Sequence, residues 1–329
     1  MRCWARTRSP DNTLAEPSQL LPGLVIAGHG RHVWVETPDG RRVICHPRGK
    51  KSQTVVGDRV LWQSSEDEGT IEKVLPRNNL LYRQDEIRTK SFAANLDQVV
   101  ILLGAEPEFS ESQLARALIA AEAEKIRPII VLNKRDLTPL FDRSWQRLAP
   151  YRAMGYTVLA TAFKPRESAE GSVVEPEPTD NEALALALQG KTSLILGPSG
   201  AGKSTLINRW VPQAQVLTQE ISSALNSGKH TTTSTTLYWM DAAKTTALID
   251  SPGFQEFGLH HIAPMQLAQL MPDIAAHAGE CKFYNCSHLH EPGCGVLHAM
   301  QQASPQAAIS ATRFKIYSDL FAELSQTRY

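Results

Sequence analysis

The stretch Ile195-Leu-Gly-Pro-Ser-Gly-Ala-Gly-Lys-Ser-Thr205 (ILGPSGAGKST) contains the full G-x-x-x-x-G-K-S pattern of a phosphate-binding loop. An apolar run at 193–196 precedes it, and the helical run STLINRW follows. In this strand–loop–helix context, backbone N–H groups at the start of the helix bind phosphate. The residues predicted to contact the nucleotide here are Gly197, Pro198, Ser199, Gly200, Ala201, Gly202, Lys203, Ser204 and Thr205. Lys203 supplies charge to the β- and γ-phosphates, and the Ser204 hydroxyl ligates Mg²⁺.

Downstream, Asp250-Ser-Pro-Gly253 follows an apolar strand predicted at 246–249. D-x-P-G alone is a common turn. After a neighbouring strand in a domain with a phosphate loop, however, the aspartate can hold Mg²⁺ through water, and the glycine N–H can contact the γ-phosphate. We therefore predict Asp250 as a magnesium residue and Gly253 as a nucleotide contact.

Upstream, Asn133-Lys-Arg-Asp136 (NKRD) ends a buried apolar run at 128–132. The Asp136 carboxylate can accept hydrogen bonds from guanine N1–H and N2–H₂, whereas adenine would leave a desolvated carboxylate unpaired. The stem of Lys134 can cover the base. We predict that Asn133, Lys134, Arg135 and Asp136 bind guanine, helped by backbone contacts of Thr161 and Ala162 after the next strand. Guanine recognition argues against the alternative of an ATP-using phosphotransferase.

Base recognition thus precedes phosphate binding, the reverse of the usual order. All these motifs lie at carboxyl ends of predicted strands, which meet at one crevice whatever order the chain visits them. The predicted α/β domain is therefore a circularly permuted nucleotide-binding domain, and neither motif is accidental. Its helices include one beginning at Ser110, which has Gln113 three residues later. Residues 164–182 are predicted to be an acidic linker.

The run Gly228-Lys-His-Thr-Thr-Thr-Ser-Thr-Thr236 lies where a switch loop belongs. Any of the three threonines at 231–233 could ligate Mg²⁺ (Thr231, Thr232 or Thr233), and the spacing does not choose among them. We name Thr232 as the predicted ligand. Because Phe254 follows Gly253 and cannot position water, His230 is the nearest polar candidate for that role. Spacing alone favours a solvated histidine.

Two further modules flank this domain. Between Gly23 and about Leu81, short apolar runs separated by turns predict an all-β barrel of the OB type. It carries a basic run and two tryptophans that could be stacking platforms or core residues. These residues are Arg41, Arg42, His46, Arg48, Lys50, Lys51, Trp34 and Trp62. After about residue 260 the pattern is helical, with a helix predicted to start at Ser304-Pro305.

Cys281-x₄-Cys286-x-His288-x₅-Cys294 supplies three thiolates and an imidazole, a donor set that binds Zn²⁺ tetrahedrally in closed structural sites. His290 or His298 could replace His288. The other two of the five cysteines, Cys3 and Cys45, are isolated and predicted to be inert. Clustered cysteines without a disulfide framework indicate a reducing compartment, and we expect the cytoplasm.

Composition is that of an ordinary globular protein: 329 residues, 42% apolar, 21% charged and zero formal net charge. No apolar run approaches the length of about 18 residues that spans a bilayer, and the amino terminus lacks the apolar core of a secretion signal. We therefore expect no membrane association. Any RNA binding must rest on local patches, because the whole chain has no basic excess.

Taken in order, NKRD, GPSGAGKS, GKHTTT, DSPGF with EFG, and the Cys/His cluster make the chain resemble the circularly permuted, small-ribosomal-subunit-dependent GTPases called RsgA or YjeQ. The first twenty residues lack apolar periodicity and are predicted to be a flexible tail (1–20). The resemblance implies an OB-fold domain (21–85), a permuted G domain (86–260) and a helical zinc-binding domain (261–329). The chain differs from the family pattern at two places. It has Lys229 where arginine or glutamine is common, and its amino-terminal tail is short and only mildly basic.

The resemblance also implies hydrolysis of GTP to GDP and phosphate in late assembly of the small ribosomal subunit, stimulated by that subunit and its rRNA. It assigns His230 as a catalytic residue beside Lys203, and one structural zinc on Cys281, Cys286, His288 and Cys294. We expect a monomer. An alternative is an RNA-binding assembly module that uses GTP only as a conformational timer.

Overall fold

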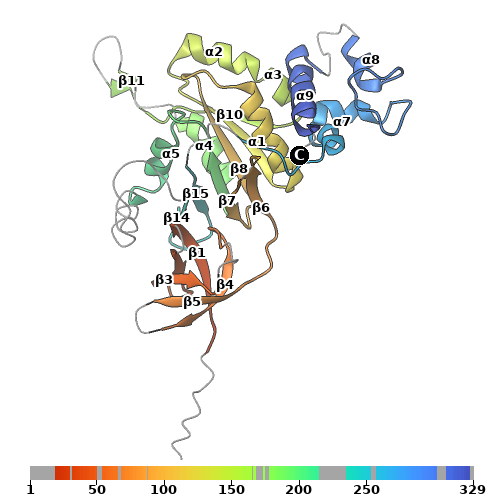
Figure 1. Cartoon of the computed structure of the whole chain (residues 1–329). Coiled ribbons are helices and arrows are strands. Elements are labelled where there is room, and N and C mark those ends of the chain that lie inside the picture. The colour runs from red at the N-terminus through yellow and green to blue at the C-terminus, as the bar shows by residue number, and fades with distance from the viewer. Residues whose placement is uncertain are drawn as a thin grey trace, which may run out of the picture.

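The computed structural model describes residues 19–29, 32–49, 54–65, 68–86, 88–164, 181–214, 235–252, 257–301 and 309–326, with the backbone of 166–167, 173–174 and 178–180. Figure 1 shows a barrel, a central α/β sheet and a group of C-terminal helices in succession.

The barrel has five strands that close on themselves. They are β1 (Leu21–His29), β2 (His32–Glu36), β3 (Arg42–Pro47), β4 (Arg59–Ser64) and β5 (Gly69–Val74). They pair in the order β1-β2-β3-β5-β4, and β4 returns to pair with β1. Only the β3–β5 pair is parallel. This closed barrel confirms the predicted OB-type architecture.

Alternating inward side chains fill the barrel, among them Val25, Val35 and Ile71. Trp62 lies in the same core and is 4% exposed. Of the two roles open to it, Trp62 is therefore a core residue and not a stacking platform. Trp34 is half-buried and packs against the larger core of the α/β domain.

The α/β sheet contains six strands in the order β10-β9-β8-β13-β15-β14. Their bounds are β8 (Gln98–Gly104), β9 (Arg127–Asn133), β10 (Thr157–Ala160), β13 (Thr192–Leu196), β14 (Thr236–Trp239) and β15 (Ala247–Asp250). All neighbouring pairs are parallel except β14–β15. Strand β13, which leads into the phosphate loop, lies beside β8, where the chain enters the sheet. The permuted arrangement predicted from motif order is the one observed.

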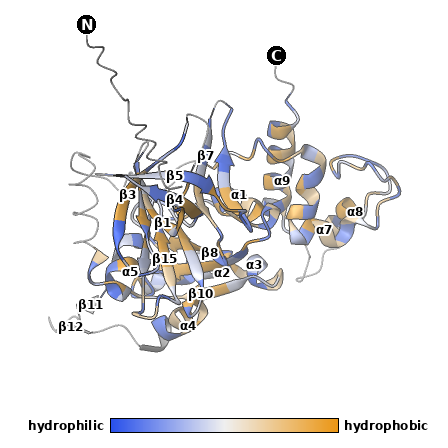
Figure 2. Cartoon of the chain, turned by 90° about the horizontal axis from the view of Figure 1, so that it is seen from below, coloured by the Kyte–Doolittle hydropathy of each residue, from blue (hydrophilic) through white to orange (hydrophobic). Residues whose placement is uncertain are grey.

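Helices cover both faces of this sheet because its buried strands alternate apolar side chains between two cores. Val99 and Ile101 face the core that includes α1 (Glu111–Ala123), whereas Val100 and Leu102 face α5 (Lys203–Trp210). Helices α2 (Thr138–Arg147) and α3 (Ala149–Ala153) join α1, and α4 (Pro178–Leu188) joins α5. Figure 2 shows the apolar side of these elements turned inward.

Two local predictions are settled by these helices. Ser110 caps α1, accepting from the Gln113 N–H at 3.3 Å, as predicted. The predicted linker at 164–182 includes regular elements among the residues that the structure describes. It contains the short paired strands β11 (Arg166–Glu167) and β12 (Val173–Val174), and its end already belongs to α4.

A hairpin of β6 (Leu80–Gln84) and β7 (Thr89–Ala94) connects the barrel to the rest of the chain. The C-terminal elements are the 3₁₀ helix η1 (Pro264–Leu270) and the helices α7 (Pro272–Ala278), α8 (Gly295–Gln301) and α9 (Ala311–Leu324). On α9, the side chains of Tyr317 and Leu320 are buried. Helix α9 begins after its cap Ser310, whose hydroxyl accepts the Arg313 N–H. The predicted helix start at Ser304-Pro305 lies outside the described residues.

Candidate functional site

The phosphate loop wraps the end of β13 against its neighbours. Gly202 has φ +110, and a Cβ there would lie 2.4 Å from Asn133 Nδ2, so only glycine fits between the phosphate loop and the NKRD segment. Helix α5 starts at Lys203, so its unpaired N–H groups face the loop. Ser204 is exposed at this end. The local structure is that of an anion-binding site.

Lys203 and Asp250 form the charged centre of the site. The Lys203 ammonium donates to the carbonyls of Gly197 (2.7 Å) and Pro198 (2.9 Å). Burial lowers the pKa of Lys203, and the negative charge of Asp250 partly opposes this lowering. Burial raises the pKa of Asp250 to about 6, against the effect of Lys203.

Asp250 is 8% exposed, and its Oδ1 has no hydrogen-bond partner among the described residues. The neighbouring Ser251 hydroxyl donates to the Ile195 carbonyl at 2.9 Å, which ties the start of this segment to β13. An unpaired buried carboxylate oxygen is costly unless a cation or its water shell completes it. With the exposed Ser204 hydroxyl, these oxygen donors fit Mg²⁺, which prefers oxygen ligands and retains waters.

The base-recognition segment is bonded directly to the phosphate loop. Asn133 is 4% exposed, and its Nδ2 donates to the Ala201 carbonyl at 3.0 Å. Thr161 is fully buried; its hydroxyl donates to Asn133 Oδ1 at 3.5 Å, and its carbonyl accepts the Arg135 N–H at 3.1 Å. Asn133 and Thr161 of the predicted base site are therefore bonded to each other and to the phosphate loop at one edge of the sheet. Asp136, on the same segment as Asn133, is half-buried.

Two hydrogen bonds at this edge could not be predicted from any sequence motif. Asn181 of α4 donates to the Ala162 carbonyl at 3.1 Å, holding the segment predicted to face guanine O6. The Lys134 ammonium donates to the Glu106 carbonyl, in the loop after β8. Lys134 has φ +71, which is rare for a residue with a long side chain. Sequence reasoning missed both, since neither follows a spacing rule.

Several predicted residues lie outside the described part of the chain. They are Lys50, Lys51, Gly228, Lys229, His230, Thr231, Thr232, Thr233, Gly253, Phe254 and Ser304.

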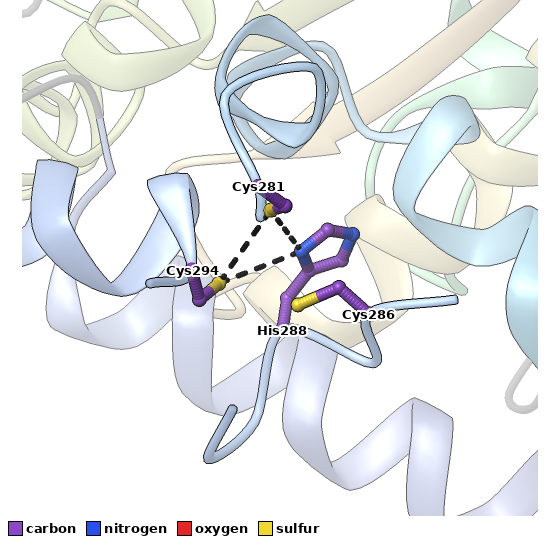
Figure 3. A group of neighbouring side chains, drawn as sticks. All are labelled: Cys281, Cys286, His288 and Cys294. Carbon is purple, nitrogen blue, oxygen red and sulfur yellow. Dashed lines mark hydrogen bonds between the residues drawn. The ribbon is translucent and has the colours of Figure 1, made fainter. Parts of the chain in front are cut away.

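Figure 3 shows Cys281, Cys286, His288 and Cys294 turned toward a common centre. Their ligand atoms all lie within 4.8 Å of one another. The Cys281 and Cys294 sulfurs are 3.8 Å apart, and His288 Nδ1 is 3.3 and 3.6 Å from them. A tetrahedral ion with Zn–S bonds of about 2.3 Å separates its sulfurs by about 3.8 Å. The donor set and its size therefore fit zinc.

The cluster is largely buried and takes His288, not His290 or His298, as its nitrogen donor. His288 has φ +62, a left-handed conformation at the tight turn after Cys286. Burial lowers the pKa of His288, which favours the neutral imidazole that ligates metals. Burial raises the pKa of the Cys286 thiol to about 12. A cation would offset this penalty on the thiolate.

Several basic side chains of the barrel run are paired with carboxylates. Arg41 pairs with Asp39 at 2.7 Å, Arg48 pairs with Glu72 at 2.6 Å, and Arg42 lies 3.5 Å from Glu36. Strand pairing brings Glu36 of β2 and Glu72 of β5 beside this run, and Asp39 lies in the turn before it, so part of its positive charge is offset.

Comparison with known proteins decides the family. The model described as RsgA GTPase matches residues 74–260. The chain belongs to the RsgA GTPase family. Two curated relatives are named small ribosomal subunit biogenesis GTPase RsgA. The one from Variovorax paradoxus is 67% identical over 98% of both chains, and that from Paraburkholderia phytofirmans is 48% identical over 97% of this chain and 98% of its own.

Solved structures agree with this membership. A circularly permuted GTPase, YloQ, aligns with a TM-score of 0.65 at 26% identity, covering 98% of this chain and all of its own. YjeQ from Thermotoga maritima aligns with a TM-score of 0.67 at 28% identity, covering 94% and 100%. As an RsgA-family member, the protein is a GTP hydrolase. Among the helices that the structure describes, none is long and apolar enough to cross a membrane.

Proposed function

We propose that the protein binds the small ribosomal subunit, acts in its late assembly, and hydrolyses GTP when stimulated by that subunit. The observation that carries the reaction is the buried Asp250 carboxylate, whose Oδ1 has no hydrogen-bond partner among the described residues and which interacts electrostatically with Lys203. It lies in the same sheet whose edge carries the bond from Asn133 to the phosphate loop. The names of the relatives support the partner. Contact with rRNA, the cytoplasmic location and the monomeric state are part of the proposal.

The chemistry needs positioning and charge more than covalent catalysis. Lys203 and the N–H groups of the phosphate loop, with Gly253, stabilise charge that develops on the γ-phosphoryl oxygens. Ser204, Thr232 and Asp250 would hold Mg²⁺, which would supply positive charge to offset the negative charge of the phosphates. His230 orients the attacking water, and Asp136 selects guanine. Asn133 and Thr161 keep the base site in register with the phosphate loop.

We further propose one structural zinc per chain on the Cys/His cluster, with no open coordination position for catalysis. The division into a tail (1–20), an OB-fold domain (21–85), a G domain (86–260) and a zinc domain (261–329) completes the proposal. The closed barrel and the separate C-terminal helices support it.

The experiment that tests this function is the rate of GTP turnover by the purified protein. The rate is measured with and without purified small subunits, each at two salt concentrations. We expect slow turnover alone and a large increase with subunits that weakens at higher salt, as charge-dependent RNA contacts do. Subunit binding without added turnover would favour the alternative, an assembly module that uses GTP as a conformational timer. Equal use of ATP would instead favour the phosphotransferase alternative.

A further inference from the structure

The loop after β8 (residues 105–110), with Gly104 at the end of the strand, lies beside the phosphate loop. At Gly104 a Cβ would lie 3.6 Å from Ala201 Cα of the phosphate loop, an ordinary van der Waals distance, but only 2.8 Å from the Glu106 carbonyl oxygen, so glycine permits the turn that this loop makes. On the other side, a Cβ at Gly200 would lie 3.4 Å from Pro107 Cδ, an ordinary van der Waals distance. Pro107 therefore lies beside the phosphate loop at Gly200.

The same loop contacts the base-recognition segment. The Ala105 N–H donates to the Asn133 carbonyl at 3.1 Å, and the Glu106 carbonyl accepts from the Lys134 ammonium. Lys134 is thus fixed at both ends, by its left-handed backbone and by this carbonyl. Its stem, proposed to cover the guanine face, keeps its direction only while residue 106 stays in place.

One side chain anchors this loop from outside the nucleotide site. Arg147, the last residue of α2, donates to Glu108 at 2.6 Å and to the Phe109 carbonyl at 3.1 Å. Its guanidinium also lies 4.4 Å from the centre of the Phe109 ring and donates to Glu111 at 3.1 Å. A planar, five-donor guanidinium is suited to such a set of acceptors, and lysine could satisfy only part of it.

We infer that Arg147 is a positioning residue for guanine nucleotide binding. By holding residues 108 and 109, it keeps the Glu106 carbonyl on the Lys134 ammonium and the lysine stem against the base. This inference deepens the proposed function and rests on its guanine site. The Lys134 stem that Arg147 supports contacts the base and not the reacting phosphate. Arg147 therefore affects the affinity for GTP and for GDP equally, and its loss raises KM but leaves kcat unchanged.

The test is the affinity of full-length Arg147→Ala for GDP and for GTP, measured by titration calorimetry, with steady-state kinetics alongside. We expect about fivefold to tenfold weaker binding of both nucleotides, the loss of about one net hydrogen bond, and unchanged kcat at saturating GTP. GDP binding needs neither turnover nor the subunit, so failure of the proposed function leaves this result interpretable.

Arg152→Ala is the matched control. Like Arg147, Arg152 donates to a backbone carbonyl, that of Trp145 at 3.1 Å, and its guanidinium lies 4.4 Å from the centre of an aromatic ring, that of Trp145. Both of these contacts lie within the α2–α3 pair. The nucleotide affinity of Arg152→Ala should stay within about twofold, because distant sites act independently.

A double-mutant cycle with Lys134→Met tests the route. In that background, Arg147→Ala should cost no further affinity; an equal loss in both backgrounds would overturn the route through Lys134. Wild-type affinity in Arg147→Ala would overturn the inference altogether. If Arg147→Ala fails to fold, Glu108→Gln removes one anchor at a side chain that is 66% exposed. We expect about twofold weaker GDP binding there, and no change would count against the inference.

Discussion

At the scale of single residues, the site depends on polar groups whose partners are few and fixed. Asp136 lies at the end of the NKRD segment, which Asn133 holds to the phosphate loop through the Ala201 carbonyl. Base selection can therefore change without moving the phosphate site. Two predictions belong to this scale.

The first concerns Asp136→Asn. Exchanging the carboxylate for an amide reverses one hydrogen bond to the base, so GTP binding should weaken by about 1–3 kcal/mol. Xanthine nucleotide, which carries an oxygen in place of the N2 amine, should gain affinity. Competition binding with GTP and XTP measures both. An unchanged preference for guanine would remove Asp136 from the site.

The second concerns His230→Ala. A group that orients water acts mainly in the transition state, so subunit-stimulated turnover should fall by about tenfold or more while GTP affinity stays nearly constant. Single-turnover hydrolysis and equilibrium binding, measured on the same preparation, separate the two. Wild-type turnover would return His230 to the role of a solvated loop residue.

At the scale of elements, the C-terminal helices are linked by the Cys/His cluster and by one buried ion pair. Arg313 of α9 donates to both carboxylate oxygens of Asp273 on α7, at 2.8 and 2.9 Å. The cluster itself holds the segment between α7 and α8, where the Gly295 N–H donates to the Cys281 sulfur at 3.3 Å. Short helices such as these derive little stability from propensity alone.

Cys286→Ser should therefore lose the metal and loosen this element, because metal binding at such sites is largely folding energy. Elemental analysis of freshly purified, never-chelated protein should find about one zinc per wild-type chain and far less in the variant. Hydrogen exchange should rise between residues 281 and 301 and stay low in β8. Cys45→Ser, in the barrel core, is the control that keeps its zinc. Wild-type protein without zinc would contradict the assignment.

At the scale of the whole molecule, the barrel joins the edge of the α/β sheet. Strand β1 pairs with β14 at Ala27 and Thr236. Beside this pair, the Glu36 carboxylate, 5% exposed, accepts from Trp239 Nε1 at 2.9 Å and from the Lys244 ammonium at 2.8 Å. One barrel side chain thus satisfies two donors from the β14–β15 hairpin.

Glu36→Ala leaves the Trp239 N–H and Lys244 without this acceptor, so we expect a loss of about 1–3 kcal/mol in the free energy of unfolding. Protease cleavage between barrel and sheet should also become faster. Glu72→Ala is the matched control, since its partner Arg48 is 73% exposed and such surface pairs contribute about 1 kcal/mol or less. Urea unfolding of both variants gives the comparison. Equal stability losses would show that Glu36 does not hold the two parts together.

The sequence by itself determined the local chemistry and the order of the modules. The phosphate loop, NKRD and the strand before Asp250 are contiguous patterns, and their backbone geometry follows from glycine, lysine and apolar runs. The permutation could also be deduced, because strand ends meet at one edge whatever their order.

Only the tertiary structure decided which distant groups meet. It assigned His288 over His290, buried Trp62 in the barrel, and paired Arg48 with a carboxylate of another strand. It also brought Arg147 to the loop that supports Lys134. These contacts join residues far apart in the chain, and their energies depend on burial and geometry that no local spacing encodes.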